Sequence, residues 1–297
     1  MTGDMAPQWD LSGRRRFGSG AVSFVSRHPV GSYLVLAFVI FWACWMPVLF
    51  FGAPPRPLSA TGAILGLALP AVLVTAATDG RAGVRDLLRR MLRWRVGIGW
   101  YLLAMLAIPV GALLLAPLFL GSAALEGLPQ NWPVLFTEFV PQLLLALVTV
   151  QVFEELGWAG FVQHRLQTRH GALKASLLVA LAFAWLHLPT YLSAPISGES
   201  AIRDLSVMVI VIPFAVCFRI LITFAYNRTR FSVLIAAISH ASFNEASEII
   251  YPNVPGPLAQ VLAFASVGLL ALLALVISKG TLAYNRDQGS VAHQVSA

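Results

Sequence analysis

The sequence predicts an all-α, polytopic membrane protein with about eight transmembrane helices bundled around an internal polar cavity. Of its 297 residues, 58% are hydrophobic and only 11% are charged, which is far from the composition of a soluble domain. The apolar residues gather in stretches of roughly 20 residues, the length that a helix needs to cross a bilayer. The basic residues fall between these stretches, and a few ionisable residues fall inside them.

Each expected span is an apolar stretch with few or no charges. The eight spans lie near residues 33–51, 59–77, 98–120, 139–161, 175–192, 205–226, 231–249 and 258–277. The first begins beyond residue 30 and lacks a small-residue cleavage site, so we interpret it as a span and not a removable signal peptide. The chain is therefore divided into a cytoplasmic N-terminal tail (1–30), a membrane domain (31–278) and a cytoplasmic C-terminal tail (279–297).

The basic residues predict the orientation of the bundle. If the N-terminus is inside, 17 of the 20 Lys and Arg residues face the cytoplasm; Arg56 and Arg203 lie outside, and Arg219 lies within the sixth span. Cytoplasmic loops are enriched in Lys and Arg, so we expect both termini in the cytoplasm of a protein integral to the plasma membrane. The net charge of +7 is then interpreted as attraction to the inner leaflet, and no nucleic-acid partner is predicted. The sequence carries no signal for an oligomeric state.

Two local patterns concern packing. Between the second and third spans, apolar residues alternate with arginines at helical spacing over 84–94, which predicts an amphipathic helix on the inner membrane surface; a plain charged loop is the alternative. Gly62 and Gly66 are four residues apart, and we interpret them as a site of close helix packing and not of dimerisation. Cys44 and Cys217 have neither the spacing of metal ligands nor that of a disulfide framework.

The polar residues at membrane depth are the candidates for function, because burying them in a bilayer costs several kcal/mol on most scales. They are Glu154, Glu155, His187, His240 and Asn244. His240 and Asn244 are four residues apart, so they share one helix face. Glu155 points about 100° away from Glu154 around the helix, and we expect it to support the site and not to act as the base.

These residue types favour hydrolysis. A buried glutamate can act as a general base for water, and an amide such as that of Asn244 can donate to a developing oxyanion. Glu154, His187 and His240 could together hold Zn²⁺. In a metal-free alternative, one histidine pairs with the glutamate while the other binds the oxyanion. The residues leave both mechanisms open.

Three short motifs from about residue 141 to 249 resemble those of the CPBP intramembrane protease family, which includes type II CAAX prenyl endopeptidases and bacteriocin-processing or self-immunity proteins. The motifs are Glu154-Glu155 followed by Leu156-Gly157-Trp158, Phe183 with His187, and His240 with Asn244. The resemblance implies a membrane-embedded metalloendopeptidase that cleaves a membrane-associated or lipidated protein. It also implies catalytic roles for the two glutamates, the two histidines and Asn244.

One position departs from the family pattern. The arginine expected after the glutamate pair and three intervening residues is replaced by Ala159, so restoring it is expected to raise activity. Arg219 could supply a substitute charge, but we interpret it as snorkelling toward the inner surface. A catalytically silent family member is one alternative function. A transporter or a non-enzymatic scaffold that uses the same cavity is another, although no inverted repeat supports transport.

Overall fold

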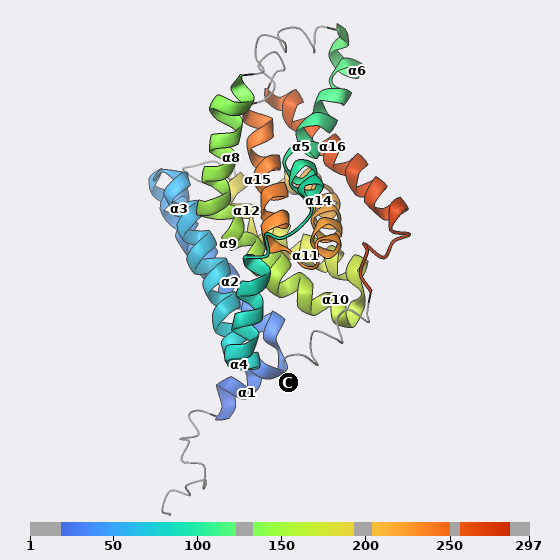
Figure 1. Cartoon of the computed structure of the whole chain (residues 1–297). Helices are drawn as coiled ribbons and strands as arrows, with labels where there is room; N and C mark the ends of the chain where they lie inside the picture. The colour runs from blue at the N-terminus through green and yellow to red at the C-terminus, as the bar shows by residue number, and fades with distance from the viewer. Residues whose placement is uncertain (1–18, 123–132, 193–203, 250–255, 286–297) are drawn as a thin grey trace, which may run out of the picture.

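The computed structural model describes residues 19–122, 133–192, 204–249 and 256–285. Within these ranges every regular element is a helix, and no strand occurs (Figure 1). The all-α prediction is therefore confirmed. Most of the two predicted tails lies outside the described residues, apart from helix α1 (Ser19–Arg27) and the turns that follow the last helix.

The described helices include four segments with wider π-helical turns, labelled η. In chain order they are α1 (Ser19–Arg27), α2 (Pro29–Phe51), α3 (Pro55–Thr61), η1 (Gly62–Ala68), α4 (Leu69–Met91), α5 (Ile98–Leu115), α6 (Pro117–Leu120), η3 (Leu135–Phe139), α8 (Val140–Ala146), η4 (Leu147–Gln151), α9 (Val152–Glu155), η5 (Leu156–Gln163), α10 (His164–His170), α11 (Ala172–Leu186), α12 (Leu188–Tyr191), α14 (Met208–Arg228), α15 (Val233–Ile249) and α16 (Gly256–Ile277).

Six described helices are long and apolar enough to cross a membrane. The fifth and seventh predicted spans are helices too, but α11 has 15 residues and α15 has 17, fewer than the roughly 20 that a full crossing needs. The count of eight spans therefore remains a prediction. Pro189 has no N–H to donate to the carbonyl oxygen of Trp185, four residues before it. Helix α11 stops at Leu186, and His187 lies between α11 and α12.

The fourth predicted span is the middle of one continuous helix, Leu135–His170, built from α and π turns in alternation. Four-residue α9 lies between the π segments η4 and η5 and carries Glu154 and Glu155. A π turn inserts an extra residue and rotates the side chains that follow, and such turns are frequent at functional sites. The local geometry thus sets the direction of the two carboxylates.

Helix α2 packs closely on η1, as the glycine pair predicts. A Cβ atom on Gly66 would lie 3.0 Å from the backbone nitrogen of Phe41, and one on Gly62 would lie 3.1 Å from the ring of the same residue. The close approach needs glycine at both positions, which confirms the packing interpretation. On the other side of the bundle, α15 contacts α5, α14 and α9 (Figure 1), so its side chains reach the helix that carries the glutamates.

The basic segment after the second span is helical, as predicted, but part of it packs against the rest of the protein. Helix α4 changes direction at Gly80, whose φ of 64° lies in the region that glycine favours. Beyond this kink, Leu87 is buried in the protein core while Leu92 and Trp94 are largely exposed. Arg90 is buried and donates to the carbonyl oxygen of Gly160. Part of the predicted membrane-facing surface is therefore a helix–helix contact.

Candidate active site

Two adjacent carboxylates form the centre of the site. Glu154 is 6% exposed and Glu155 is 0% exposed, both at the depth of the bundle where α9 meets α15. Because neighbouring residues on a helix point about 100° apart, the two carboxylates contact different partners. Glu154 faces two imidazole rings, whereas Glu155 faces an arginine and the far side of one of those rings.

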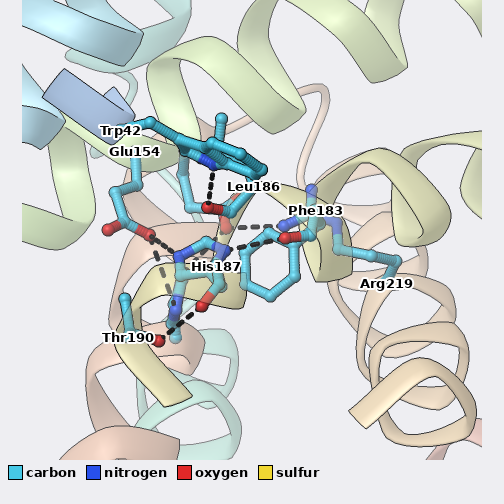
Figure 2. A network of polar contacts seen from close by, with 9 residues as sticks. Trp42, Glu154, Phe183, Leu186, His187, Thr190 and Arg219 are labelled. Carbon is cyan, nitrogen blue, oxygen red and sulfur yellow. Dashed lines mark hydrogen bonds and ion pairs between the residues drawn. The ribbon is translucent and has the colours of Figure 1, made fainter. Parts of the chain in front are cut away.

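His187 is held in a fixed orientation at the break between α11 and α12. Its Nδ1 lies 2.8 Å from the carbonyl oxygen of Phe183, and its ring centroid lies 4.2 Å from that of the phenylalanine. A carbonyl only accepts hydrogen bonds, so Nδ1 carries a proton and Nε2 is the nitrogen left to face the site. Figure 2 shows the ring directed at the carboxylate of Glu154, and Nε2 lies 3.7 Å from Oε2.

Two further side chains hold the end of α11 in place (Figure 2). The indole N–H of Trp42, from α2, donates to the carbonyl oxygen of Leu186 at 3.0 Å. The hydroxyl of Thr190 donates to the carbonyl oxygen of His187 at 2.7 Å. The Leu186 carbonyl is one of the last of α11, which lack an N–H partner in their own helix, and the His187 carbonyl also accepts the backbone N–H of Thr190 at 2.9 Å. These bonds therefore fix the backbone on which the His187 ring is mounted.

His240 reaches the same carboxylate from α15. Its Nε2 lies 3.8 Å from Oε2 of Glu154, and its Nδ1 lies 3.0 Å from Oε1 of Glu155. The carboxylate of Glu155 accepts the Nδ1 proton, and Nε2 is the nitrogen that faces Glu154. Both imidazoles thus have one nitrogen bound to a partner outside the centre and the other directed at Glu154.

Arg219 does not snorkel to the membrane surface, and that interpretation is wrong. Its side chain is 0% exposed in the middle of α14, and NH1 lies 2.6 Å from Oε1 of Glu155. The guanidinium also lies 5.7 Å from the ring centre of Phe183. A buried carboxylate beside it is a stronger attraction than the distant interface, because an unpaired charge inside a bilayer costs several kcal/mol.

Asn244 follows His240 by one turn on α15 and is half-buried. The i, i+4 spacing puts its amide on the helix face that also carries the His240 ring. The structure thus brings Glu154, Glu155, His187 and His240 into direct contact range, and it places Asn244 next to them along the helix.

The side chains supply the donor types of a zinc site, namely two neutral imidazoles and a carboxylate. Their arrangement does not fit an ion: in the part of the chain that the structure describes, no group of three His, Cys, Asp or Glu side chains is placed so that it could hold a metal. The proposed mechanism therefore includes no step through a metal.

Three residues near the site, Trp42, Thr190 and Tyr33, were not predicted from the sequence. Trp42 and Thr190 act through single hydrogen bonds to backbone carbonyls, for which the sequence carries no pattern. Tyr33 is fully buried, and its hydroxyl lies where a Cβ atom on Gly157 would be. The glycine between Glu155 and Trp158 was a signal that something packs closely on this helix.

Comparisons with known proteins match the part of the chain that carries these residues. Residues 136–246 match the family model described as Type II CAAX prenyl endopeptidase Rce1-like. Over 119 residues the chain is 31% identical to CAAX prenyl protease 2 of Methanococcus maripaludis, and the match covers 38% of this chain and 42% of the relative. The chain therefore spans less than half of the relative's own length.

The matched segment contains all five polar residues singled out from the sequence, from Glu154 to Asn244. It also contains Arg219, which pairs with the second glutamate. Over residues 136–246 the chain is therefore similar to the family described as Type II CAAX prenyl endopeptidase Rce1-like.

Proposed function

We propose that the protein is an intramembrane endopeptidase in which Glu154 activates a water molecule. One observation carries this proposal: Oε2 of Glu154 lies 3.7 and 3.8 Å from the Nε2 atoms of His187 and His240, and both rings are oriented by their other nitrogen. A carboxylate oxygen with two imidazole nitrogens beside it can hold a water molecule and accept its proton.

The chemical steps follow from this arrangement. Water donates one hydrogen to Glu154 and the other to an imidazole Nε2, and its oxygen attacks the carbonyl carbon of the peptide bond. As the C–O bond forms, the carbonyl oxygen becomes negative, and the amide N–H of Asn244 donates to it. The C–N bond then breaks, and the proton on Glu154 passes to the leaving amine. All atoms of the water end in the two products.

The bundle supports this chemistry by excluding bulk water. Phe183 packs against both imidazoles, Phe218 packs against that of His240 and Trp158 packs against Phe183, and each of the three is buried. Charges and hydrogen bonds act more strongly in such surroundings than in water.

The proposed substrate is a membrane-associated protein with a prenylated C-terminal CAAX-type sequence. This part rests on the family description and on the name of the archaeal relative, each of which refers to CAAX prenyl substrates. An active site inside a helical bundle is also suited to a lipidated chain, because the lipid keeps the substrate at the membrane.

The test uses the full chain in lipid nanodiscs and a farnesylated CAAX peptide carrying a fluorophore and a quencher. Wild type should cleave it, and Glu154→Gln should lose at least about 10²-fold in kcat, the lower end of what a general base contributes. Glu138→Gln is the matched control, because it makes the same change at an exposed position of the same long helix.

The outcomes separate the proposal from its alternatives. Equal cleavage by wild type and Glu154→Gln contradicts the role of Glu154. No cleavage of either the farnesylated peptide or its unprenylated form by wild type contradicts the endopeptidase function and favours a silent member, transporter or scaffold. Equal cleavage of both peptides contradicts only the prenylated substrate.

A further inference from the structure

Arg219 and Glu155 form a buried ion pair that the proposed water-activation step does not itself use. Both side chains are 0% exposed, and the contact joins α14 to α9 through one hydrogen bond of 2.6 Å. Replacing a buried ion pair by neutral groups is often tolerated, so stability alone is a weak reason to place two charges here.

The pair leads directly to a histidine of the site. Oε1 of Glu155 accepts from NH1 of Arg219 and also lies 3.0 Å from Nδ1 of His240. The other nitrogen of that ring faces Oε2 of Glu154 at 3.8 Å. A continuous series of contacts therefore runs from Arg219 through Glu155 and His240 to the proposed base.

Arg219 holds the middle member of this series in place. The same oxygen of Glu155 meets the guanidinium of Arg219 and Nδ1 of His240, so the guanidinium keeps that oxygen where it contacts the ring. Without Arg219 the carboxylate can rotate away from Nδ1, and the ring loses the contact that orients it. The orientation of the His240 ring thus depends on a residue of another helix.

From these contacts we propose that Arg219 is a positioning residue, which acts through Glu155 to fix Nδ1 of His240 toward Glu155 and Nε2 toward the base. This inference rests on the proposed function. Arg219 touches neither Glu154 nor, in this account, the substrate, so its effect should fall on kcat and leave KM within about twofold.

Position 159 offers a way to move the charge without removing it. Ala159 lies one turn beyond Glu155 and is fully buried. Side chains on a helix lean toward its N-terminus, so an arginine at 159 would reach back to the Glu155 carboxylate. With Arg219 present, Ala159→Arg adds a second cation to a carboxylate that already has one. This changes the expectation from the sequence: the single substitution should not raise activity.

The experiment compares kcat and KM of the full chain in nanodiscs for five variants. Arg219→Met should lower kcat about 10- to 100-fold, as loss of a supporting partner typically does. Arg219→Lys should lower kcat less, because the pair makes a single hydrogen bond, which a lysine can also donate. Arg219→Met with Ala159→Arg should regain at least about tenfold over Arg219→Met. The control Arg228→Met removes an exposed arginine from the same helix and should leave kcat unchanged.

The fifth variant covers the case in which Arg219→Met does not fold. Arg219→Met with Glu155→Gln removes both charges, so neither is left buried and unpaired. It should fold and show the same low kcat. A kcat equal to wild type in this variant, or in folded Arg219→Met, overturns the proposal. A folded Arg219→Met/Ala159→Arg variant that is no more active than folded Arg219→Met also overturns the proposal. Where Arg219→Met does not fold, the same comparison is made with Arg219→Met/Glu155→Gln.

A readout independent of activity is the ¹⁵N chemical shift of the His240 ring, which reports the nitrogen that carries the proton. It should indicate Nδ1–H in wild type and a different state once Arg219 is replaced; an unchanged shift contradicts the proposal. If wild type cleaves no peptide, the proposed function fails while this measurement still decides the role of Arg219. If wild type and all arginine variants cleave equally, the positioning role alone fails.

Discussion

Nε2 of His187 lies 3.7 Å from Oε2 of Glu154, and the opposite nitrogen of the ring is bound to the carbonyl oxygen of Phe183. The same carbonyl oxygen also accepts the backbone N–H of His187, the residue that follows the last residue of α11. The ring therefore lies at the end of the helix, and its contact with the last turn fixes which ring nitrogen faces the glutamate.

This relationship predicts a difference between two substitutions of His187. The side chain of asparagine reaches only the position of Nδ1, whereas that of glutamine reaches the position of Nε2. His187→Asn should therefore lose about 10²- to 10⁴-fold in kcat, while His187→Gln should retain more activity. Both are measured with the farnesylated peptide, and His170→Gln, at an exposed position, is the control. Equal activity of the asparagine and glutamine variants would show that Nε2 is not the functional atom.

Asn244 is expected to donate to the oxyanion, which gives it a different kinetic signature. Asn244→Ala should lower kcat about 10²- to 10³-fold, the typical cost of one oxyanion donor, with little change in KM. Asn244→Asp should be no better, because a carboxylate accepts and does not donate. A rise in KM with kcat unchanged would assign Asn244 to substrate binding instead.

The sequence was sufficient for the fold class because membrane spans are specified by length and composition, which can be read locally. It was not sufficient for the breaks and π turns that set the directions of His187 and Glu154, since these depend on packing between helices. The same limit applies to Arg219. A charge in the middle of a span indicates function, but its partner Glu155 is 64 positions away, and spacing alone could not pair them.

The main residues of the candidate site were predictable from the sequence, but the contacts that orient them were not. Glu154, His187 and His240 were recognisable as polar residues at membrane depth, and the structure brings them together. Trp42 and Thr190 were not recognisable, because each donates a single hydrogen bond to a backbone carbonyl, which no residue pattern indicates.

Chelation tests whether the imidazoles orient water directly. The described histidines and carboxylates form no group of three placed to hold an ion, so we expect activity to survive prolonged treatment with 1,10-phenanthroline and EDTA. Metal content of the purified protein is measured in parallel. Loss of activity that returns on adding zinc would support the metal-dependent mechanism, with Glu154, His187 and His240 as the ligands.

The distribution of arginine and lysine predicts the orientation in the membrane. Since 17 of the 20 basic residues fall on one side of the predicted spans, both termini should be cytoplasmic. Alkaline phosphatase, which is active only outside the cytoplasm, should be inactive when fused to either end, and a fluorescent reporter should be active there. Opposite results at the two ends would require an odd number of spans.

The last prediction concerns the close contact behind the two glutamates. A Cβ atom on Gly157 would overlap the hydroxyl of Tyr33 and lie 3.1 Å from its ring carbon Cζ. Both residues are buried, so Gly157→Ala should lower the free energy of unfolding by about 1–3 kcal/mol, the usual cost of overpacking. It should also displace Glu154 and reduce kcat. Tyr33→Phe removes the overlapping oxygen, so the double variant should recover much of both losses, whereas Tyr33→Phe alone should be close to wild type in stability. Thermal unfolding in nanodiscs and peptide cleavage measure the two effects, and a double variant as unstable as Gly157→Ala would mean that the clash lies elsewhere, for example with the carbonyl oxygen of Leu67, 3.2 Å from the same Cβ position.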